Sequence, residues 1–179
     1  MKLCRFPAAR LALLGAIGLA LATSTSRAIA ATTVVLARHA EKVTIQETPD
    51  PPLTEAGLAR AAALARVLAD VPLDAAYATH YRRTRDTAKP AATVHGLAVQ
   101  ERDARDVAGT AAEILREHDG DTVLIVGHSN TVPAMIRALG VDTDLTLNEA
   151  EDYDDLFVVR IDDDGRATLL HLHYGAPSG

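Results

Sequence analysis

Two short apolar runs, each ending in a histidine, constrain the fold of this chain more than any other feature. Residues 34–39 (VVLARH) end in His39, which follows Arg38, and residues 123–128 (VLIVGH) end in His128. Short runs of β-branched and aliphatic residues are typical of strands that are buried on both faces of a parallel sheet. Ligands of open α/β sheets bind at the carboxyl ends of such strands. The two imidazoles are therefore predicted to face a common pocket.

Segments with helical spacing alternate with strand-like segments along the chain. Thr54 is the expected N-cap of a first helix, whose apolar stripe consists of Leu58, Ala61, Ala62, Ala65 and Leu68. A second helix is expected from about residue 81 or 82 to residue 94, with Pro90 as a kink or break and Gly96 at its end. Two more helices are expected, one around residues 107–118 with Asp106 as its N-cap and one at about 131–139.

The remaining strand-like segments complete the predicted fold. They lie at residues 74–78, 156–161 and 167–172, and the turn signal of residues 162–165 joins the last two into a hairpin. Strands that alternate with helices favour a sheet covered on both faces. The chain is therefore predicted to be an α/β protein, with three α/β/α layers, a mainly parallel central sheet and an antiparallel C-terminal hairpin.

The first thirty residues have the pattern of a secretory signal peptide. An apolar run at residues 11–22 is followed by the small-x-small cleavage pattern of residues 28–30, and the basic residues Lys2, Arg5 and Arg10 precede both. The run is short for a membrane span, and an uncleaved anchor is the alternative. We expect export to the periplasm or out of the cell, with residues 31–179 forming one domain.

Charge and cysteine content limit the partners of the exported chain. Cleavage would leave 149 residues with 14 basic and 24 acidic side chains, a net charge of −10, because four basic residues leave with the leader. So acidic a chain is expected to repel nucleic acid and anionic membranes, which argues against either as a stable partner. The chain's single cysteine, Cys4, lies in the leader, so disulfide and thiolate chemistry is not expected after cleavage.

A cluster of arginines belongs to the same predicted edge of the sheet as the histidines. Arg38 adjoins His39, and three more arginines begin four residues after the strand expected to end at residue 78: Arg82, Arg83 and Arg85. A phosphate monoester carries two negative charges, and the planar guanidinium binds its oxygens bidentately. The pattern favours phosphoryl transfer onto a histidine.

Four motifs in order resemble the histidine phosphatase superfamily, whose fold is phosphoglycerate-mutase-like. They are Arg38-His39, residues 52–57 (PLTEAG), residues 79–88 (THYRRTRDTA) and residues 127–130 (GHSN). Any one of them is a weak signal, but their order and spacing cover nearly the whole chain after the leader. The resemblance implies an exported phosphatase that needs neither metal nor cofactor and acts on a small phosphorylated substrate. A phosphomutase and a phosphate-binding domain without turnover are the alternatives.

The resemblance also implies roles for individual residues. His39 would be the nucleophile, neutral at its attacking nitrogen and donating from the other nitrogen to a backbone carbonyl. Arg38 and Arg83 would clamp the phosphoryl oxygens, and a cationic His128 would stabilise them in the transition state. Further candidates for substrate contact are His80 and Ser129.

The sequence departs from the family pattern in three places. Ala40 replaces the usual glycine after the nucleophile, and Ile45 stands where many members carry an asparagine that contacts phosphate. The third departure is the acid that protonates the leaving group, for which the candidates are Asp103, Glu101 and Glu41. A missing acid would restrict the enzyme to good leaving groups such as phosphohistidine or an acyl phosphate.

Two other polar features receive structural interpretations. His171 and His173 have the i, i+2 spacing that can bind zinc on a strand, but no acidic or thiol partner is evident, so they are predicted to be strand or surface residues. Residues 149–155 carry five acids in seven positions and are predicted to form a solvated loop. The alternative for this segment is a cap over the pocket.

Overall fold

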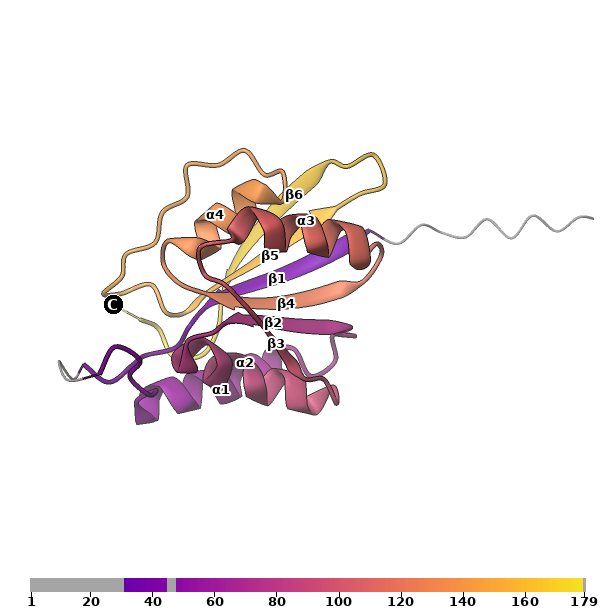
Figure 1. Cartoon of the computed structure of the whole chain (residues 1–179). Coiled ribbons are helices and arrows are strands. Elements are labelled where there is room, and N and C mark those ends of the chain that lie inside the picture. Colours follow the sequence, from indigo (N-terminus) through magenta and orange to yellow (C-terminus); the bar gives the residue numbers. More distant parts are fainter. Residues whose placement is uncertain (1–30, 45–47, 179) are drawn as a thin grey trace, which may run out of the picture.

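A computed structural model describes residues 31–44 and 48–178 of the chain (Figure 1). The expected leader and the departure at Ile45 lie outside the described residues. The elements in chain order are β1 (Thr32–Arg38), α1 (Glu55–Val67), β2 (Ala75–Thr79), α2 (Arg82–Val94), β3 (Val99–Arg102), α3 (Val107–Glu117), β4 (Thr122–Gly127), α4 (Thr131–Ala138), β5 (Asp155–Ile161) and β6 (Ala167–His173).

The strands form one six-stranded sheet in the order β3-β2-β4-β1-β5-β6. β3, β2, β4 and β1 pair in parallel, whereas β5 pairs antiparallel with β1 and with β6. The mainly parallel sheet and its antiparallel C-terminal hairpin are thus confirmed. The edge strand β3 was not predicted, because its four residues (VQER) carry no apolar run and none of them is fully buried.

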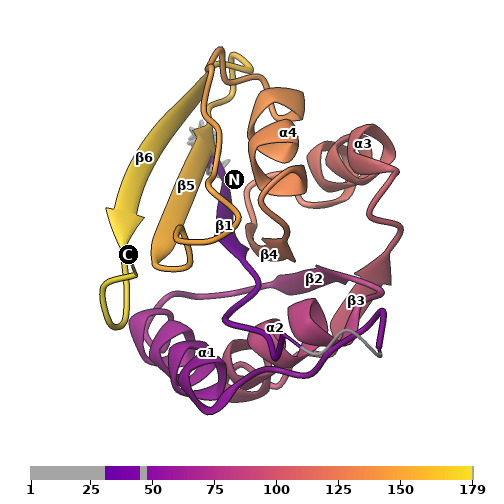
Figure 2. The same cartoon turned by 90° about the vertical axis from the view of Figure 1, so that its left-hand side faces the viewer.

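Helices cover both faces of this sheet, α1 and α2 on one and α3 and α4 on the other (Figure 2). Alternate residues of β1 serve the two layers: Val35 packs in the core with α1 and α2, and Leu36 packs with α3 and α4. Burial on both faces explains why β1 and β4 read as continuous apolar runs. The same arrangement carries His39 and His128 to one edge of the sheet.

The buried face of α1 differs from the predicted stripe. Ala61, Ala65 and Leu68 are buried as predicted, whereas Leu58 is 58% exposed and Ala62 is exposed. Leu64 and Arg60, which the stripe did not include, are buried as well. Arg60 turns inward because its side chain finds a carboxylate and two backbone carbonyls there. The buried face of α1 therefore includes an ion-paired arginine, which apolar periodicity does not indicate.

The predicted helix ends are mostly confirmed. Thr54 accepts a hydrogen bond from the Gly57 N–H, and Asp106 accepts one from the Gly109 N–H. α2 ends at Val94 as predicted and runs through Pro90 without a break. Over residues 31–44 and 48–178, we find no helix whose length and apolar character would allow it to cross a membrane.

Candidate active site

The two histidines of the apolar runs lie side by side. β1 and β4 are parallel neighbours, in register with Arg38 opposite Gly127, so the residue after each strand emerges at the same edge. The His39 N–H donates to the Gly127 carbonyl over 2.9 Å, and the ring centroids of His39 and His128 are 5.3 Å apart. The structure therefore brings together the imidazoles that the sequence placed at one pocket.

His39 is oriented by the backbone of the next residue. Its Nδ1 lies 2.9 Å from the Ala40 carbonyl oxygen, which can only accept, so Nδ1 carries the proton and Nε2 keeps its lone pair. Burial lowers the pKa of His39 to about 3, and the neighbouring charges of His128 and Arg38 lower it further against that hydrogen bond. The imidazole is therefore neutral at neutral pH, with Nε2 free to act as a nucleophile.

His128 is held through a chain of hydroxyl groups. Its Nε2 lies 2.9 Å from the Thr79 hydroxyl, which in turn lies 2.8 Å from the Thr84 hydroxyl. The Thr84 hydroxyl donates to the Tyr81 carbonyl, which can only accept. It therefore accepts from the Thr79 hydroxyl, and Thr79 in turn accepts from His128. This direction puts the His128 proton on Nε2 and leaves the lone pair of Nδ1 facing the Nη2 group of Arg83, 3.4 Å away.

The protonation of His128 in the site without an anion depends on burial and on the neighbouring arginines. Burial lowers its pKa to about 4, and the positive charges of Arg83 and Arg38 contribute to the same direction. His128 is therefore neutral at neutral pH in this arrangement of the site, and its positive charge in the presence of substrate stays a prediction. A bound dianion would offset the arginine charges and favour protonation at Nδ1, which would convert that nitrogen into a donor.

Arg83 reaches the site from the first turn of α2. Its guanidinium lies over the Tyr81 ring, 4.4 Å from the centroid, and 3.6 Å from a carboxylate oxygen of Asp50. Its side chain is largely buried, yet its Nε–H has no hydrogen-bond partner in the structure. Buried donors are normally paired, so this N–H marks a position where an acceptor group belongs.

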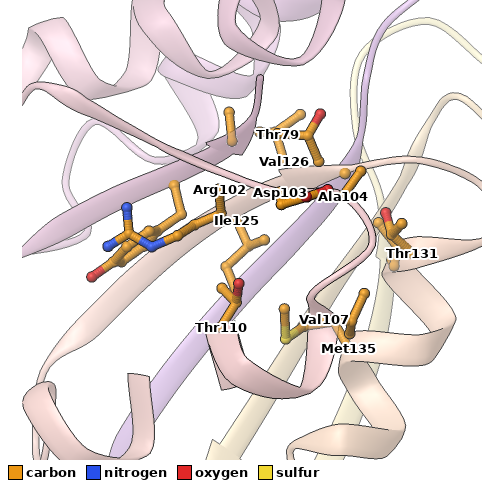
Figure 3. A pocket seen from close by; sticks show the side chains of 14 residues that line it. Thr79, Arg102, Asp103, Ala104, Val107, Thr110, Ile125, Val126, Thr131 and Met135 are labelled. Atoms are coloured by element: carbon orange, nitrogen blue, oxygen red, sulfur yellow. The ribbon is translucent and has the colours of Figure 1, made fainter. Parts of the chain in front are cut away.

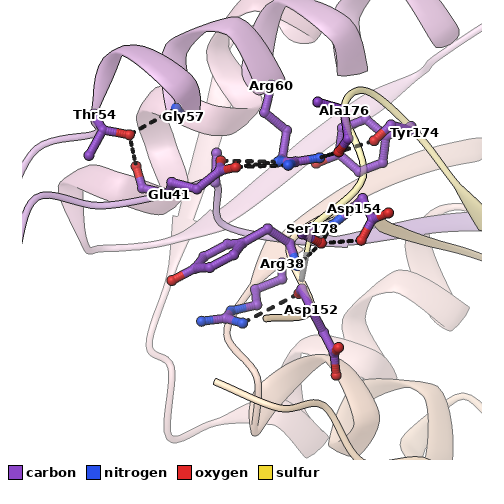
Figure 4. Close-up of polar contacts among 12 residues, drawn as sticks. Arg38, Glu41, Thr54, Gly57, Arg60, Asp152, Asp154, Tyr174, Ala176 and Ser178 are labelled. Atoms are coloured by element: carbon purple, nitrogen blue, oxygen red, sulfur yellow. Dashed lines mark hydrogen bonds and ion pairs between the residues drawn. The ribbon is translucent and has the colours of Figure 1, made fainter. Parts of the chain in front are cut away.

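Arg38 precedes His39 in the chain, and its side chain is hydrogen-bonded to the segment before β5 (Figure 4). Its Nη1 donates to the carbonyl of Asn148 over 2.9 Å and to that of Asp152 over 3.3 Å, and its Nη2 donates to the carbonyl of Glu149. The guanidinium also lies over the Tyr153 ring, 4.0 Å from the centroid. Its buried Nε–H, like that of Arg83, has no hydrogen-bond partner among residues 31–44 and 48–178. Arg38 thus orders this loop beside the site.

The acidic segment is therefore not the freely solvated loop predicted from its charge. Its backbone carbonyls bind Arg38, and the Tyr153 ring lies 6.2 Å from the His39 ring. The alternative interpretation, a cap beside the pocket, describes its position better. Charge composition did not reveal this role because the contacts are made by main-chain oxygens.

A cleft of about 520 Å³ opens at the two imidazoles. Its lining is mainly polar and consists of His39, Tyr81, Arg83, Ala104, Arg105, His128, Ser129, Asn130, Thr131 and Glu149. Of the predicted substrate contacts, Ser129 lines the cleft and His80 does not. Sequence reasoning missed Tyr81, although it lies in the motif of residues 79–88, and it missed Arg105 and Glu149, which no motif includes.

The three predicted proton donors lie in other contacts. Glu41 is bound to Arg60, with a shortest distance of 2.7 Å, Glu101 pairs with Arg85 at 2.8 Å, and Asp103 pairs with the exposed Arg105 at 2.9 Å. The bonds that Arg105 donates lower the pKa of the Asp103 carboxyl to about 2. None of these carboxylates lines the cleft at His39, whereas Glu149 does.

A second, apolar cavity lies next to the cleft, between β2, β4 and the helices α3 and α4 (Figure 3). Its volume is about 30 Å³, and it shares Ala104 and Thr131 with the lining of the cleft. That volume is close to the space one water molecule occupies, so the cavity cannot hold a substrate group of any size. Among the described residues, a His–Asp group close enough to hold a metal ion occurs at the β5–β6 hairpin, outside the cleft.

Comparisons with known proteins agree with this geometry. The family model of the histidine phosphatase superfamily (branch 1) matches residues 34–106. No curated relative matches the chain. Among solved structures, a protein of Agrobacterium tumefaciens assigned as the phosphohistidine phosphatase SixA is similar, with 22% identity, a TM-score of 0.60, and coverage of 82% of this chain and 98% of that one.

A second solved structure, a mycobacterial glucosyl-3-phosphoglycerate phosphatase, has 17% identity and a TM-score of 0.61, covering 78% of this chain and 97% of the other. These likenesses establish the fold, and the family model covers the strand and arginine motifs that carry His39 and Arg83. The chain is thus similar to the histidine phosphatase superfamily (branch 1) over residues 34–106, and it shares the fold of these solved structures.

Proposed function

We propose that this protein is a phosphatase that hydrolyses a small phosphorylated compound through a covalent phosphohistidine on His39. One observation carries the proposal: a neutral, oriented imidazole lies 5.3 Å from a second imidazole and beside two guanidinium groups with unpaired buried donors. This arrangement offers a nucleophile together with acceptor-seeking groups for a dianion. The similar proteins named as phosphatases support the same reaction class.

The reaction takes two displacements on phosphorus. In the first, the Nε2 lone pair of His39 forms the P–N bond as the bond to the leaving oxygen breaks, and that oxygen takes a proton from an acid. In the second, water attacks the phosphorus, the P–N bond breaks, and inorganic phosphate leaves with His39 neutral again. Arg83 and a protonated His128 donate to the non-bridging oxygens, where charge shifts during each transfer.

Glu149 supplies the leaving-group proton in this proposal. It is the acidic side chain among the residues that line the cleft with His39, and its side chain is 75% exposed and 4.0 Å from the Lys42 ammonium. The alternatives Glu41, Glu101 and Asp103 are all engaged in ion pairs, and none of the three lines the cleft. We expect Glu149→Gln to slow hydrolysis of alkyl phosphates by about 100-fold, while hydrolysis of a phosphoramidate changes little because its leaving group needs less help.

Residues 1–30 are proposed to direct export to the periplasm or out of the cell. The basic start, apolar run and Ala28-Ile29-Ala30 pattern support this proposal, with residues 31–179 as the catalytic domain. Sequencing the N-terminus of the protein recovered from outside the cytoplasm tests it. A first residue of Ala31 is expected, and recovery of uncleaved protein with the membranes would favour an anchor instead.

The central experiment separates the phosphatase from its alternatives. The protein is incubated in chelator with alkyl, aryl and sugar phosphates and with a phosphoramidate, and released phosphate is followed for the protein and for His39→Ala. We expect release that is lost in the variant, and an acid-labile phosphoryl group on the trapped protein. Isomerised product without release would identify a mutase, and binding without turnover of any compound would identify a phosphate-binding domain.

A further inference from the structure

The antiparallel hairpin at the far edge of the sheet brings two histidines to a buried carboxylate. His173 pairs in register with Asp155, and His171 pairs with Phe157, two residues further along β5. Side chains of residues in register, and of residues two apart, lie on one face of a sheet. His171 and His173 are exposed residues of a strand, as predicted. The expected lack of an acidic partner is wrong, because the register of β5 with β6 supplies Asp155.

The contacts within this group are close. His171 Nε2 lies 2.6 Å from Asp155 Oδ1, and His173 Nδ1 lies 3.4 Å from the same oxygen. The nearest ligand atoms of the three residues all lie within 4.8 Å of one another. Around a tetrahedral ion with bonds of about 2.0–2.1 Å, neighbouring ligand atoms are about 3.4 Å apart, so small rotations of the two imidazoles would complete this geometry.

Burial distinguishes the three residues in a useful way. The Asp155 side chain is 8% exposed, whereas those of His171 and His173 are 42% and 65% exposed. The carboxylate is thus fixed in the sheet, while the imidazoles can move at an edge strand that leaves a path for an ion. The His171 ring also stacks on the buried Phe157 ring at 4.5 Å, which limits its orientation. A fourth atom that can bind a metal ion is also near, since the carboxylate oxygen Oδ2 of Asp154 lies 3.6 Å from His173 Nδ1.

We propose that Asp155, His171 and His173 form a binding site for a divalent transition-metal ion of the zinc class, separate from the catalytic cleft. Two imidazole nitrogens and one carboxylate oxygen are a ligand set that suits zinc and its neighbours, whereas magnesium and calcium prefer oxygen ligands. Water or the Asp154 carboxylate completes the coordination. The site joins Asp155, the first residue of β5, to the last residues of β6, so a bound ion stabilises the β5–β6 pair.

The site differs from the other imidazole–carboxylate pair of the fold. His118 Nδ1 lies 3.0 Å from Asp121 Oδ2, but its Nε2 is occupied by the Tyr77 hydroxyl at 2.8 Å. That pair offers one nitrogen and one carboxylate, with no second imidazole. It therefore provides a matched control, because both sites contain a histidine beside an aspartate and only one has the donors for an ion.

Metal titration tests this proposal on the untagged protein, since a polyhistidine tag would itself bind the probe. After treatment with chelator and its removal, Zn²⁺ is added in a calorimeter, and Co²⁺ binding is followed by its visible absorption. We expect one equivalent of Zn²⁺ with a dissociation constant of about 1 µM or lower, no binding of Mg²⁺, and a rise in Tm with Zn²⁺.

The variants identify the ligands. His171→Gln with His173→Gln should weaken Zn²⁺ binding at least about a hundredfold, because loss of second-shell partners alone costs about ten- to hundredfold. Both imidazoles are exposed, so this variant should fold, and His118→Gln should keep the wild-type affinity. Absence of Zn²⁺ binding in the wild type, or binding that survives in the double variant and disappears in His39→Ala, would overturn the proposal.

Discussion

Two largely buried arginines, Arg60 and Arg83, pair with carboxylates of the segment that follows β1, and they differ in how many of their N–H donors have a partner. Arg60 binds the Glu41 carboxylate with Nε and Nη2, and its Nη1 donates to the carbonyls of Tyr174 and Ala176 (Figure 4). Arg83 is also largely buried, but its Nε–H has no partner and its contact with Asp50 is long, at 3.6 Å. All three nitrogens of the Arg60 guanidinium donate hydrogen bonds, whereas the Nε–H of Arg83 needs an acceptor.

This difference separates a structural arginine from a binding one. A guanidinium with all of its donors engaged has nothing left to offer a substrate, and it joins α1, the loop after β1 and the C-terminal segment. A guanidinium with an unpaired donor beside two imidazoles is prepared for an anion at a cost in stability. Burial alone would have placed Arg60 and Arg83 in the same class.

The largest expected effect comes from removing the Arg60 side chain. Arg60→Ala leaves the Glu41 carboxylate partly buried without its partner, and we expect a loss of about 3–5 kcal/mol in the free energy of unfolding. Urea denaturation followed by circular dichroism measures it. A loss below 1 kcal/mol would show that the pair is no more than a surface ion pair, and would remove the contrast with Arg83.

The next effect concerns activity instead of stability. Arg83→Ala removes a charge-assisted donor to the phosphoryl oxygens, and we expect kcat/KM to fall at least about 100-fold with a small change in stability. Arg82→Ala is the matched control, since Arg82 is the adjacent residue and pairs with Asp86 on the exposed face of α2. Near-normal activity of Arg83→Ala, or an equal loss in both variants, would exclude Arg83 from the site.

The smallest expected effect is a difference in the pH at which the two regions, the His39–His128 pair and the Glu41–Arg60 pair, lose unfolding free energy. The pKa values of His39 and His128 are lowered to about 3 and about 4, so these imidazoles contribute stability above pH 6.5 that is lost as pH falls towards those values. Between about pH 7 and about pH 5.5 we expect the pair to account for about 2 kcal/mol of lost unfolding free energy. The lowered pKa of Glu41 acts later, below its ordinary value of 4.5.

Urea denaturation at several pH values, repeated with His39→Gln and His128→Gln combined, checks this difference. The variant should show a flatter dependence from pH 7 down to about pH 3, where the folded imidazoles take up their protons, and the further loss below pH 4.5 that comes from Glu41 should remain in both proteins. Equal slopes in the upper range would mean that the two imidazoles are not held neutral by the fold. Added inorganic phosphate should raise the pKa of His128, because a dianion favours its protonated form.

The apolar runs allowed much of the site to be predicted from the sequence. A strand buried on both faces has an unmistakable composition, and the residue after a parallel strand must lie at the carboxyl edge of the sheet. His39 and His128 were therefore placed at one edge without knowledge of the register. The arginine cluster was placed by its distance from the preceding strand, and Arg83 was singled out within it by the family resemblance. Part of the buried face of α1 was missed because a buried ion pair, Arg60 with Glu41, has no apolar signature.

The sequence by itself determined the layers of the fold, its helix caps and the edge at which the two imidazoles meet, because these follow from local composition and from the periodicity of strands and helices. Only the tertiary structure decided that Arg38 binds the carbonyls of the segment before β5, that Glu149 lines the cleft, and that Asp155 lies between His171 and His173. Each of these contacts depends on the course of a loop or the register of a hairpin. Such features are set by long-range packing, which no short stretch of residues records.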